Sequence, residues 1–225
     1  MTKIQKTSLI LNLLIFVSVV FAIISMLTGF RFMTEPEKPA VLSAANAKAF
    51  KYFTVDSNML AGLVALVAAI CRILTAKGRI KNIPKILPLF KLAATTGVTL
   101  TMLITTLFLA PFQFGFFVLF TDSNLFMHLL IPLLCIIVFV FFEPAEISAR
   151  QTIAGVIPML IYAVFYAANI ILHLENGQTS QTYDWYGFLG GGFNTIGIVA
   201  LAMFSFTLLI AWSLRIANEK FAQHS

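Results

Sequence analysis

Charged side chains are scarce in this sequence of 225 residues, since Asp, Glu, Lys and Arg together make up only 11% of it. A soluble domain of this size carries charge at roughly a quarter of its positions. The scarcity therefore excludes an ordinary cytosolic enzyme and a disordered chain. Cysteine is also rare, and Cys71 and Cys135 both lie in apolar runs, which excludes a secreted disulfide scaffold and a cysteine metal site.

Apolar residues make up 60% of the chain, and the mean hydropathy of +0.94 indicates an integral membrane protein. A membrane-spanning helix needs about 20 apolar residues. We therefore expect an all-α, polytopic protein in which residues 1–225 form a single membrane domain, a bundle of six transmembrane helices. The predicted spans are residues 8–30, 53–75, 92–110, 123–142, 151–174 and 193–214.

Three details of these spans are predicted separately. The first is longer than the apolar part of a signal peptide and lacks a cleavage motif, so we expect it to be retained. The third is expected to end at Pro111, because proline interrupts helices. Residues 112–120 are apolar but broken by Gly115, and we expect them to lie in the membrane interface or to dip into the protein.

The positions of Lys and Arg predict the orientation. With the N-terminus in the cytoplasm, eleven of these residues fall on the inner side, and the four on the outer side are Arg31, Lys38, Lys48 and Lys51. Inner loops of membrane proteins carry the excess of positive charge. We therefore expect both termini in the cytoplasm, in a bacterial plasma membrane. The bases lie between spans and do not form a nucleic-acid surface, so no nucleic-acid partner is expected.

Polar groups at membrane depth are costly, which makes each one a functional candidate. In the predicted topology they gather at the outer ends of the spans, whereas the inner halves contain little comparable. The candidates at the outer ends are Thr54, Asp56, Asn58, Asn124, His128, His173, Trp185, Tyr186 and Asn194. In the third span, Thr95, Thr99 and Thr106 fall within about 40° of one another on a helix, and this hydroxyl stripe is a candidate cavity wall.

Several of these groups also have structural interpretations. Asp56 at the start of a span is a good helix cap, and threonines in spanning helices commonly serve packing. Trp185 and Tyr186 suit an aromatic belt at the membrane interface. His128 is different, because it lies about one and a half turns inside an otherwise apolar helix, where an imidazole without a partner is rare.

A threonine and a histidine on neighbouring helices suit nucleophilic chemistry. A threonine hydroxyl becomes a competent nucleophile when a neutral imidazole takes its proton and when donors stabilise the developing oxyanion. Thr54 and His128 are the candidates for these two roles. The remaining polar groups at the outer ends are candidates for binding the substrate or orienting the imidazole.

Three segments with these residues resemble a known family. They are Phe50-Lys51-Tyr52-Phe53-Thr54, then Asn124-Leu125-Phe126-Met127-His128 with Pro132 four residues later, and Asp184-Trp185-Tyr186-Gly187-Phe188-Leu189. In order and spacing, the sequence resembles the androgen-inducible and androgen-dependent membrane threonine hydrolases, and most of all their bacterial six-transmembrane branch. The resemblance covers about residues 50–215.

The resemblance implies a multipass hydrolase that cleaves fatty acid esters of hydroxy fatty acids. The family's threonine nucleophile and essential histidine fall on Thr54 and His128. The position of Asp56 and the longer loop at residues 190–192 depart from the family pattern, which leaves the identity of the substrate open.

We therefore expect an intramembrane hydrolase of the serine/threonine type that cleaves a lipid ester arriving from the bilayer, with its site near the outer leaflet. No metal or organic cofactor is expected. Two alternatives stay open. One is a haem-binding redox protein in which His128 and His173 ligate the iron. The other is a lipid-binding transporter or receptor without catalysis.

Overall fold

The computed structural model describes residues 1–33, 46–189 and 193–222, and every regular element in these ranges is helical. Lys38 and residues 190–192 lie outside the described residues. Six helices are long and apolar enough to cross a membrane, which confirms the predicted all-α membrane bundle: Lys3–Thr28, Phe53–Ala76, Leu87–Phe112, Asp122–Phe142, Arg150–Leu172 and Thr195–Phe221.

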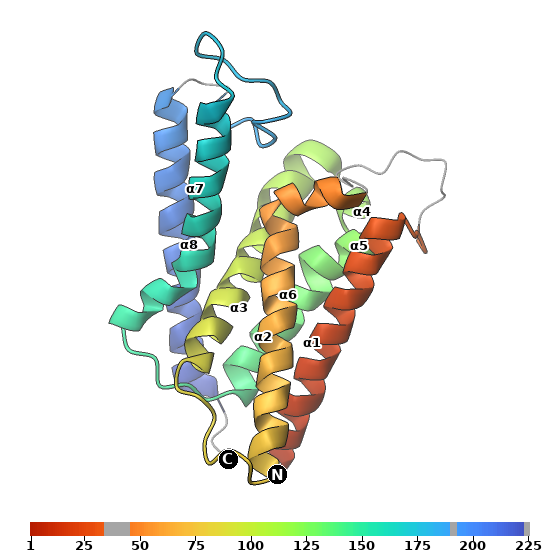
Figure 1. Cartoon of the computed structure of the whole chain (residues 1–225), viewed down its shortest axis with the longest axis vertical. Helices are drawn as coiled ribbons and strands as arrows, with labels where there is room; N and C mark the ends of the chain where they lie inside the picture. The colour runs from red at the N-terminus through yellow and green to blue at the C-terminus, as the bar shows by residue number, and fades with distance from the viewer. Residues whose placement is uncertain (34–45, 190–192, 223–225) are drawn as a thin grey trace.

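Both chain termini lie at the same end of the bundle, which we name the N/C end (Figure 1). The opposite end, named the distal end, holds the start of helix α2 (Phe53–Ala76), residues 173–189 after α7 (Ile157–Leu172), and the start of α8 (Phe193–Phe221). Helix α5 (Asp122–Leu125), which begins the fourth span, lies at this same end in Figure 1, so the second and fourth spans begin at one end of the bundle, as the predicted topology requires.

Helix α1 (Lys3–Thr28) begins five residues before the predicted start at residue 8. The Thr2 hydroxyl accepts a hydrogen bond from the backbone N–H of Gln5, and the side-chain oxygen of Gln5 accepts one from the backbone N–H of Thr2. This reciprocal capping satisfies two amides that a helix start leaves free, so the polar residues before the apolar run become helical. The helix ends at Gly29, whose φ of 69° is the left-handed conformation that glycine adopts readily.

The third span does not end at Pro111, so that prediction is wrong. Helix α3 (Leu87–Ile104) continues into a π-helical segment, Thr105–Phe114, that contains Pro111. Proline breaks an α-helix partly by clashing with the carbonyl four residues earlier, and the wider π-helical winding moves that carbonyl away. Beyond Gly115, the short helix α4 (Phe116–Leu119) leaves Phe117 89% exposed, which favours an interfacial position for this segment.

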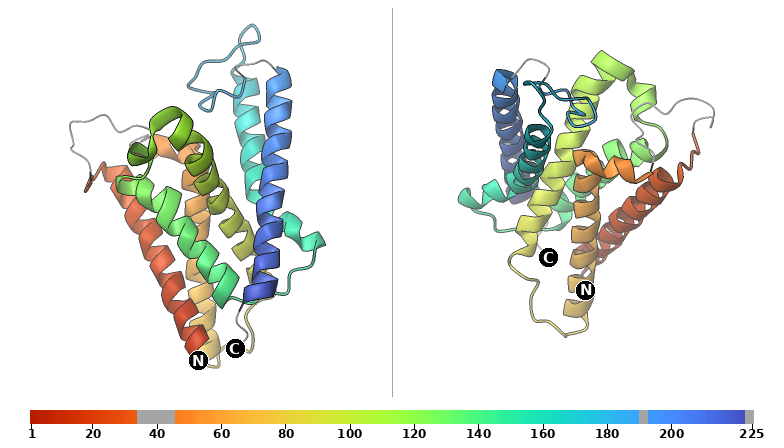
Figure 2. Two further views of the ribbon diagram at one scale, coloured as in Figure 1. Left: turned by 180° about the vertical axis from the view of Figure 1, so that it is seen from behind. Right: turned by 45° about the horizontal axis from the view of Figure 1, so that its top comes forward.

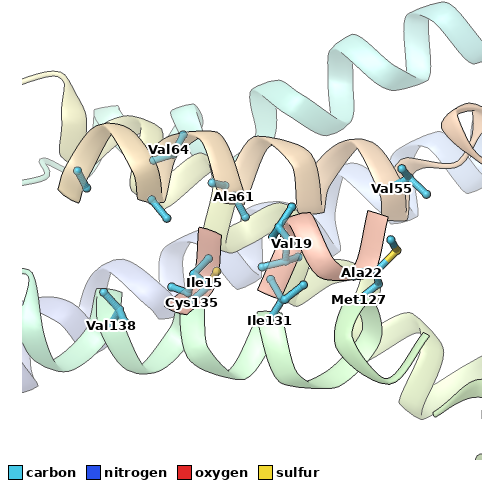
Figure 3. Close-up of a cluster of buried hydrophobic side chains, with 14 of the residues drawn as sticks. Ile15, Val19, Ala22, Val55, Ala61, Val64, Met127, Ile131, Cys135 and Val138 are labelled. Atoms are coloured by element: carbon cyan, nitrogen blue, oxygen red, sulfur yellow. The ribbon is translucent and has the colours of Figure 1, made fainter. Parts of the chain in front are cut away.

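Two apolar cores hold the bundle together. In the first, shown in Figure 3, α1 packs between α2 and α6 (Ile131–Ile137) through side chains such as Val19 and Ile131. Gly62 lets α1 and α2 approach closely, because a Cβ there would lie 2.8 Å from the Val19 side chain. The second core joins α3 to α8 and to the 3-10 helix Arg150–Val156 that precedes α7.

Helices α7 and α8 run side by side as a pair next to the remaining helices (Figure 2). Their contact with the bundle is closest at the N/C end, where Gly155, in the 3-10 helix before α7, lies against α3: a Cβ there would lie 2.9 Å from the Thr96 hydroxyl oxygen. Helix α8 has little cover. In its most apolar stretch of 18 residues only 17% of the residues are buried, whereas the share for the third span is 61%. This uneven packing leaves space between α7 and the bundle.

Candidate active site

Thr54 is the second residue of α2, at the distal end. The residue before the helix, Tyr52, makes no capping bond with its side chain. The amides of Val55 and Asp56 bond to the Tyr52 carbonyl, and the Phe53 amide donates to the Tyr186 hydroxyl at 3.1 Å. Among the described residues, the Thr54 amide has no acceptor. A free N–H and the positive end of the helix dipole therefore lie next to the candidate nucleophile.

Asn58 links the turn of α2 that carries Thr54 to the segment that carries His128. Its side chain is fully buried and donates to the Thr54 carbonyl at 2.7 Å and to the Met127 carbonyl at 3.1 Å. Residues four apart share one face of a helix. The α2 face that carries Thr54 therefore lies against the π-helical segment Phe126–Leu130, which contains His128.

His128 is 6% exposed, and its imidazole lies within hydrogen-bonding reach of the Leu119 backbone. Its Nδ1 atom is buried and has no partner among the described residues. The π-helical winding has a local cause, because Pro132 has no amide to donate to the His128 carbonyl four residues earlier. Single π-helical turns are frequent at functional sites, and most buried polar atoms are paired, so this unpaired nitrogen is unusual.

No hydrogen bond joins the Thr54 hydroxyl to the His128 ring in the described part of the chain. The two residues lie on facing helical segments, and Asn58 connects the backbone of Thr54 to that of Met127, the residue before His128. The structure thus brings the predicted pair to adjacent helices without direct contact between the reactive groups.

An apolar groove of about 710 Å³ lies beside this pair, between α2, α3 and α7. Four α2 residues line it, and their spacing of three or four positions places them on one face of the helix: Phe53, Asp56, Ser57 and Leu60. Thr54 and His128 do not line this groove, since Thr54 lies on the next face of α2. The predicted threonine stripe does not line it either. Thr99 donates to the Thr95 carbonyl of its own helix at 2.7 Å, as in the packing interpretation.

Residues 183–189 cover the distal end of the groove. Asp184 is buried, and its carboxylate accepts hydrogen bonds from the Tyr166 hydroxyl and from the amides of Phe188 and Leu189. The Trp185 indole donates to the Tyr162 hydroxyl at 3.1 Å, and that hydroxyl donates to the Lys51 carbonyl at 2.6 Å. This network holds Trp185 against the groove.

Tyr186 belongs to the same segment, and its hydroxyl accepts the Phe53 amide. Burial raises the pKa of the Tyr186 phenol above its ordinary value of 10.0, so the group stays neutral at physiological pH. A neutral phenol keeps its proton as a donor while its oxygen accepts the amide. The predicted Tyr186 is therefore in direct contact with the helix turn that carries Thr54.

The remaining predicted residues lie apart from this contact. His173 is exposed, stacks on Tyr183 with ring centroids 3.6 Å apart, and bonds through Nδ1 to the Asn169 carbonyl at 2.8 Å. Thr106 and Asn124 are half-buried, and neither side chain has a hydrogen-bond partner in the described ranges. Asn194 belongs to α8, but its side chain lies outside the described residues.

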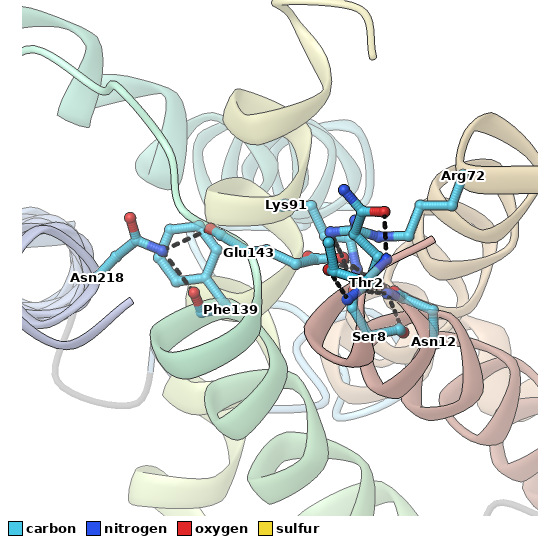
Figure 4. A network of polar contacts seen from close by, with 9 residues as sticks. Thr2, Ser8, Asn12, Arg72, Lys91, Phe139, Glu143 and Asn218 are labelled. Atoms are coloured by element: carbon cyan, nitrogen blue, oxygen red, sulfur yellow. Dashed lines mark hydrogen bonds and ion pairs between the residues drawn. The ribbon is translucent and has the colours of Figure 1, made fainter. Parts of the chain in front are cut away.

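A second polar cluster, at the N/C end, was not expected from the sequence. Glu143 directly follows the fourth span, and its Oε1 accepts hydrogen bonds from the Ser8 hydroxyl at 3.0 Å and the Asn12 amide at 2.7 Å (Figure 4). The Lys91 ammonium lies 3.1 Å from Oε2, and the Arg72 guanidinium lies 3.6 Å from Oε1. The prediction that the inner halves of the spans contain little comparable is wrong.

The charges of the neighbouring cations keep the Glu143 carboxyl ionised. Burial alone would raise the pKa of the Glu143 carboxyl, but Lys91 and Arg72 outweigh burial and hold the pKa below its ordinary value. Lys91 also donates to the Asn12 side chain. The cluster thereby joins α1, α2 and α3 to the end of the fourth span, and its central carboxylate is surrounded by donors.

The clue to this cluster lies in the first span. Ser8 and Asn12 are four residues apart, so both polar side chains share one face of a helix that is otherwise apolar at this depth. Such a pair requires a polar partner from another helix. Glu143 and Lys91 lie just outside the predicted spans 123–142 and 92–110, and Arg72 lies near the end of the predicted span 53–75, so none of them was expected to partner this pair.

Within the described ranges, no group of three or more side chains of the metal-binding types gathers in one place. Comparison of the chain with protein-family models, with curated proteins and with solved structures finds no match.

Proposed function

We propose that the protein is an intramembrane hydrolase of the serine/threonine type that cleaves a lipid ester, with Thr54 as nucleophile and His128 as general base. The observation that carries this proposal is the Asn58 side chain, which ties the backbone of Thr54 to that of Met127, the neighbour of His128. The unpartnered Nδ1 of His128 and the free Thr54 amide support the same pairing of roles.

The reaction begins with attack of the Thr54 hydroxyl oxygen on the ester carbonyl, as the His128 imidazole takes the hydroxyl proton. The tetrahedral oxyanion is stabilised by a donor aimed at the developing charge, and the Thr54 amide at the positive end of α2 suits this role. Collapse of the intermediate breaks the ester bond, and the imidazolium gives its proton to the leaving alkoxide. The alcohol departs and Thr54 carries the acyl group.

Water then completes the cycle. The neutral imidazole takes a proton from the water molecule as the water oxygen attacks the acyl carbonyl. The imidazolium then gives that proton to the Thr54 oxygen when the acyl–oxygen bond of Thr54 breaks. The products are a fatty acid and a free threonine hydroxyl. Because catalytic hydrogen bonds often tighten only in the complex with substrate, we expect the contact between hydroxyl and imidazole to form on binding.

The expected orientation, with both termini in the cytoplasm, places the distal end in the outer half of a bacterial plasma membrane. An ester in the outer leaflet would reach Thr54 from the bilayer without crossing water. The interfacial α4 beside His128 and the aromatic segment at residues 183–189 lie at the same end, as a site near the membrane surface requires.

The proposal is tested with purified protein in detergent, using a fluorophosphonate probe and a long-chain fluorogenic ester. We expect Thr54→Ala to abolish both labelling and hydrolysis, and His128→Gln to slow hydrolysis by about 100-fold or more, the usual contribution of a general base. Thr28→Ala is the matched control, because Thr28 is an exposed threonine at the end of α1. Full labelling and hydrolysis in the Thr54→Ala protein would exclude the proposal.

The groove favours one second candidate, a lipid-binding protein without catalysis. Saturable lipid binding without turnover, in protein that is folded and pure, would support that function. The haem alternative has less support from the geometry, because His173 stacks on Tyr183 while His128 lies against α4. A visible absorption band in the purified protein would restore the haem alternative.

A further inference from the structure

The groove between α2, α3 and α7 is long. Along α7 it runs from Ile157 to Asn169, which at 1.5 Å per residue is about 18 Å. Its volume of about 710 Å³ is typical of small-molecule sites, which occupy roughly 300–1,000 Å³. A long space of this volume fits one extended chain.

The side of the groove opens onto the apolar surface of the bundle. Phe90, Ile161 and Phe165 line it and are also among the exposed large apolar side chains, at 48%, 53% and 71%. In a membrane these side chains face the acyl chains of lipids. A lipid chain therefore reaches the groove sideways, from the bilayer.

The charged side chains that line the groove lie at its distal end. Lys51 and Asp56 are the charged side chains that line it in the described structure, and neither forms an ion pair there. The Lys51 ammonium lies 5.2 Å from the centre of the Trp185 ring, a cation–π contact that holds it at the end of the groove. A cation and an anion thus lie at one end of an apolar groove, each without its counter-charge.

We propose that this groove binds a lysophospholipid with a zwitterionic head group. The single acyl chain lies along α7, the phosphate lies at Lys51 and the ammonium group lies near Asp56. Opposite charges on the protein match opposite charges on the ligand, so a head group with one of each sign satisfies both. A fatty acid alone would satisfy only Lys51, and a lipid with two chains would leave one chain outside the groove.

Cleavage of this ligand by Thr54 needs the ester to leave the groove, because Thr54 does not line it. In a lysophospholipid the ester lies one glycerol below the phosphate, so with the phosphate at Lys51 the ester lies near the start of α2 and has to move to the neighbouring face of that helix. Cleavage rests on the proposed function, and it would transfer the acyl group to Thr54 and release the glycerophosphate head group as the alcohol. Water would then release the fatty acid.

Binding is measured in the Thr54→Ala protein, so that cleavage does not interfere. The probe is a lysophosphatidylethanolamine with a diazirine in its acyl chain, and the crosslinked peptides are identified by mass spectrometry. We expect crosslinks on α7 between residues 157 and 165, displaced by the unlabelled lipid. Crosslinks confined to helices that do not line the groove, or equal displacement by a two-chain lipid, would overturn the proposal.

Charge variants provide the second arm. Lys51→Gln is expected to weaken binding of lysophosphatidylethanolamine by about tenfold or more, the effect of losing a charge-assisted contact. Asp56→Asn is expected to weaken binding of the same lipid. It is expected to tighten binding of lysophosphatidylglycerol, which has no ammonium group. Lys48→Gln, a nearby exposed lysine outside the groove, is the matched control. Unchanged affinities in both groove variants would contradict the proposal.

The two proposals fail separately. Lysolipid binding in the groove without any hydrolysis by the wild-type protein would remove the catalytic function and keep the groove. Hydrolysis of a short soluble ester through Thr54, without lysolipid binding, would remove the groove ligand and keep the catalytic function. Ala93→Phe, which places a ring at a buried wall of the groove, should abolish lysolipid binding while short-ester hydrolysis persists.

Discussion

Two polar regions at the ends of the bundle differ in how well their groups are partnered. At the N/C end, Glu143 lies among two cations, a hydroxyl and an amide that all contact its carboxylate. At the distal end, the Thr54 amide, the His128 Nδ1 and the charges of Lys51 and Asp56 lack such partners among the described residues. Polar groups at membrane depth are functional candidates by default, and this contrast indicates that partnering separates structural groups from reactive ones.

The packing differs in the same direction. Near the N/C end, helices approach so closely that a Cβ on Gly155 would lie 2.5 Å from the Ala211 side chain. Toward the distal end, α8 is poorly covered and a Cβ on Gly197 would meet nothing within 4 Å. The tight end fixes the helices relative to one another, and the loose end has room for a ligand.

The largest effect is expected at the Glu143 cluster. Glu143→Gln removes the carboxylate at the centre of the cluster and leaves Lys91 and Arg72 buried without its charge. Breaking a buried ion pair in this way costs about 3–5 kcal/mol in the free energy of unfolding. Thermal unfolding in detergent measures the loss, and Glu146→Gln, an exposed carboxylate three residues later, is the control. Equal melting temperatures for the two variants would show that the cluster is not structural.

The same cluster predicts a pH dependence. Because the folded-state pKa of Glu143 is held below its ordinary value of 4.5, the carboxylate contributes stability that is fully present above pH 4.5. That contribution is lost as the pH falls through the folded-state pKa. Unfolding temperatures of the wild-type protein and of Glu143→Gln should therefore converge on acidification below pH 4.5. A constant difference between them would contradict this assignment.

A smaller effect is expected from the two glycines. Gly155→Ala forces a methyl group into the contact with Ala211 and should lower the free energy of unfolding by about 1–3 kcal/mol, the usual cost of overpacking. Gly197→Ala should be neutral or slightly stabilising, because alanine favours a helix and meets no neighbour. If both variants unfold alike, the proposed difference in packing between the ends is wrong.

Asn58 connects stability to activity at the distal end. Asn58→Ala removes the bridge between the Thr54 and Met127 carbonyls and should lower the free energy of unfolding by about 1–2 kcal/mol. Because the bridge positions Thr54, kcat for ester hydrolysis should fall by about tenfold or more. Thr101→Ala, which removes a buried side-chain hydrogen bond to the Val98 carbonyl within α3, is the control for stability. Hydrolysis at the wild-type rate in Asn58→Ala would remove Asn58 from the positioning role.

The smallest effect is expected at Tyr186. Tyr186→Phe keeps the ring but removes the hydroxyl that accepts the Phe53 amide, at a cost of about 0.5–1.5 kcal/mol in the free energy of unfolding. The freed amide lies one residue from Thr54, so kcat should change more than KM. A change confined to KM would indicate that Tyr186 contacts the lipid and not the start of α2.

The spans were predictable because an apolar run of about 20 residues is the length that crosses a bilayer as a helix. Their ends were less so, since the capping of α1 at Thr2 and the passage of the third span through Pro111 depend on local hydrogen bonds. The meeting of Thr54 and His128 at one end followed from the order and direction of the spans. The connection through Asn58 did not, because helix rotation is set by packing.

The Glu143 cluster could not be predicted from charge spacing, because its members come from four separate segments and each alone resembles an ordinary helix-end residue. The groove was also beyond the sequence, since it depends on how α7 leans from the bundle at its distal end. The threonine stripe around Thr99 had correct spacing, but the helix face it occupies is covered by packing. Periodicity identifies a face, and only packing determines what lies against it.

Trapping the acyl-enzyme is the decisive experiment for the pairing of Thr54 with His128. Purified protein is mixed with an ester that carries an isotopically labelled acyl chain, quenched in acid within the first turnovers, and digested for mass spectrometry. We expect the labelled acyl group on Thr54, in larger amount in His128→Gln if deacylation slows more than acylation, and absent in Thr54→Ala. Rapid hydrolysis with no acyl group on Thr54, or with the acyl group on another residue, would exclude Thr54 as the nucleophile.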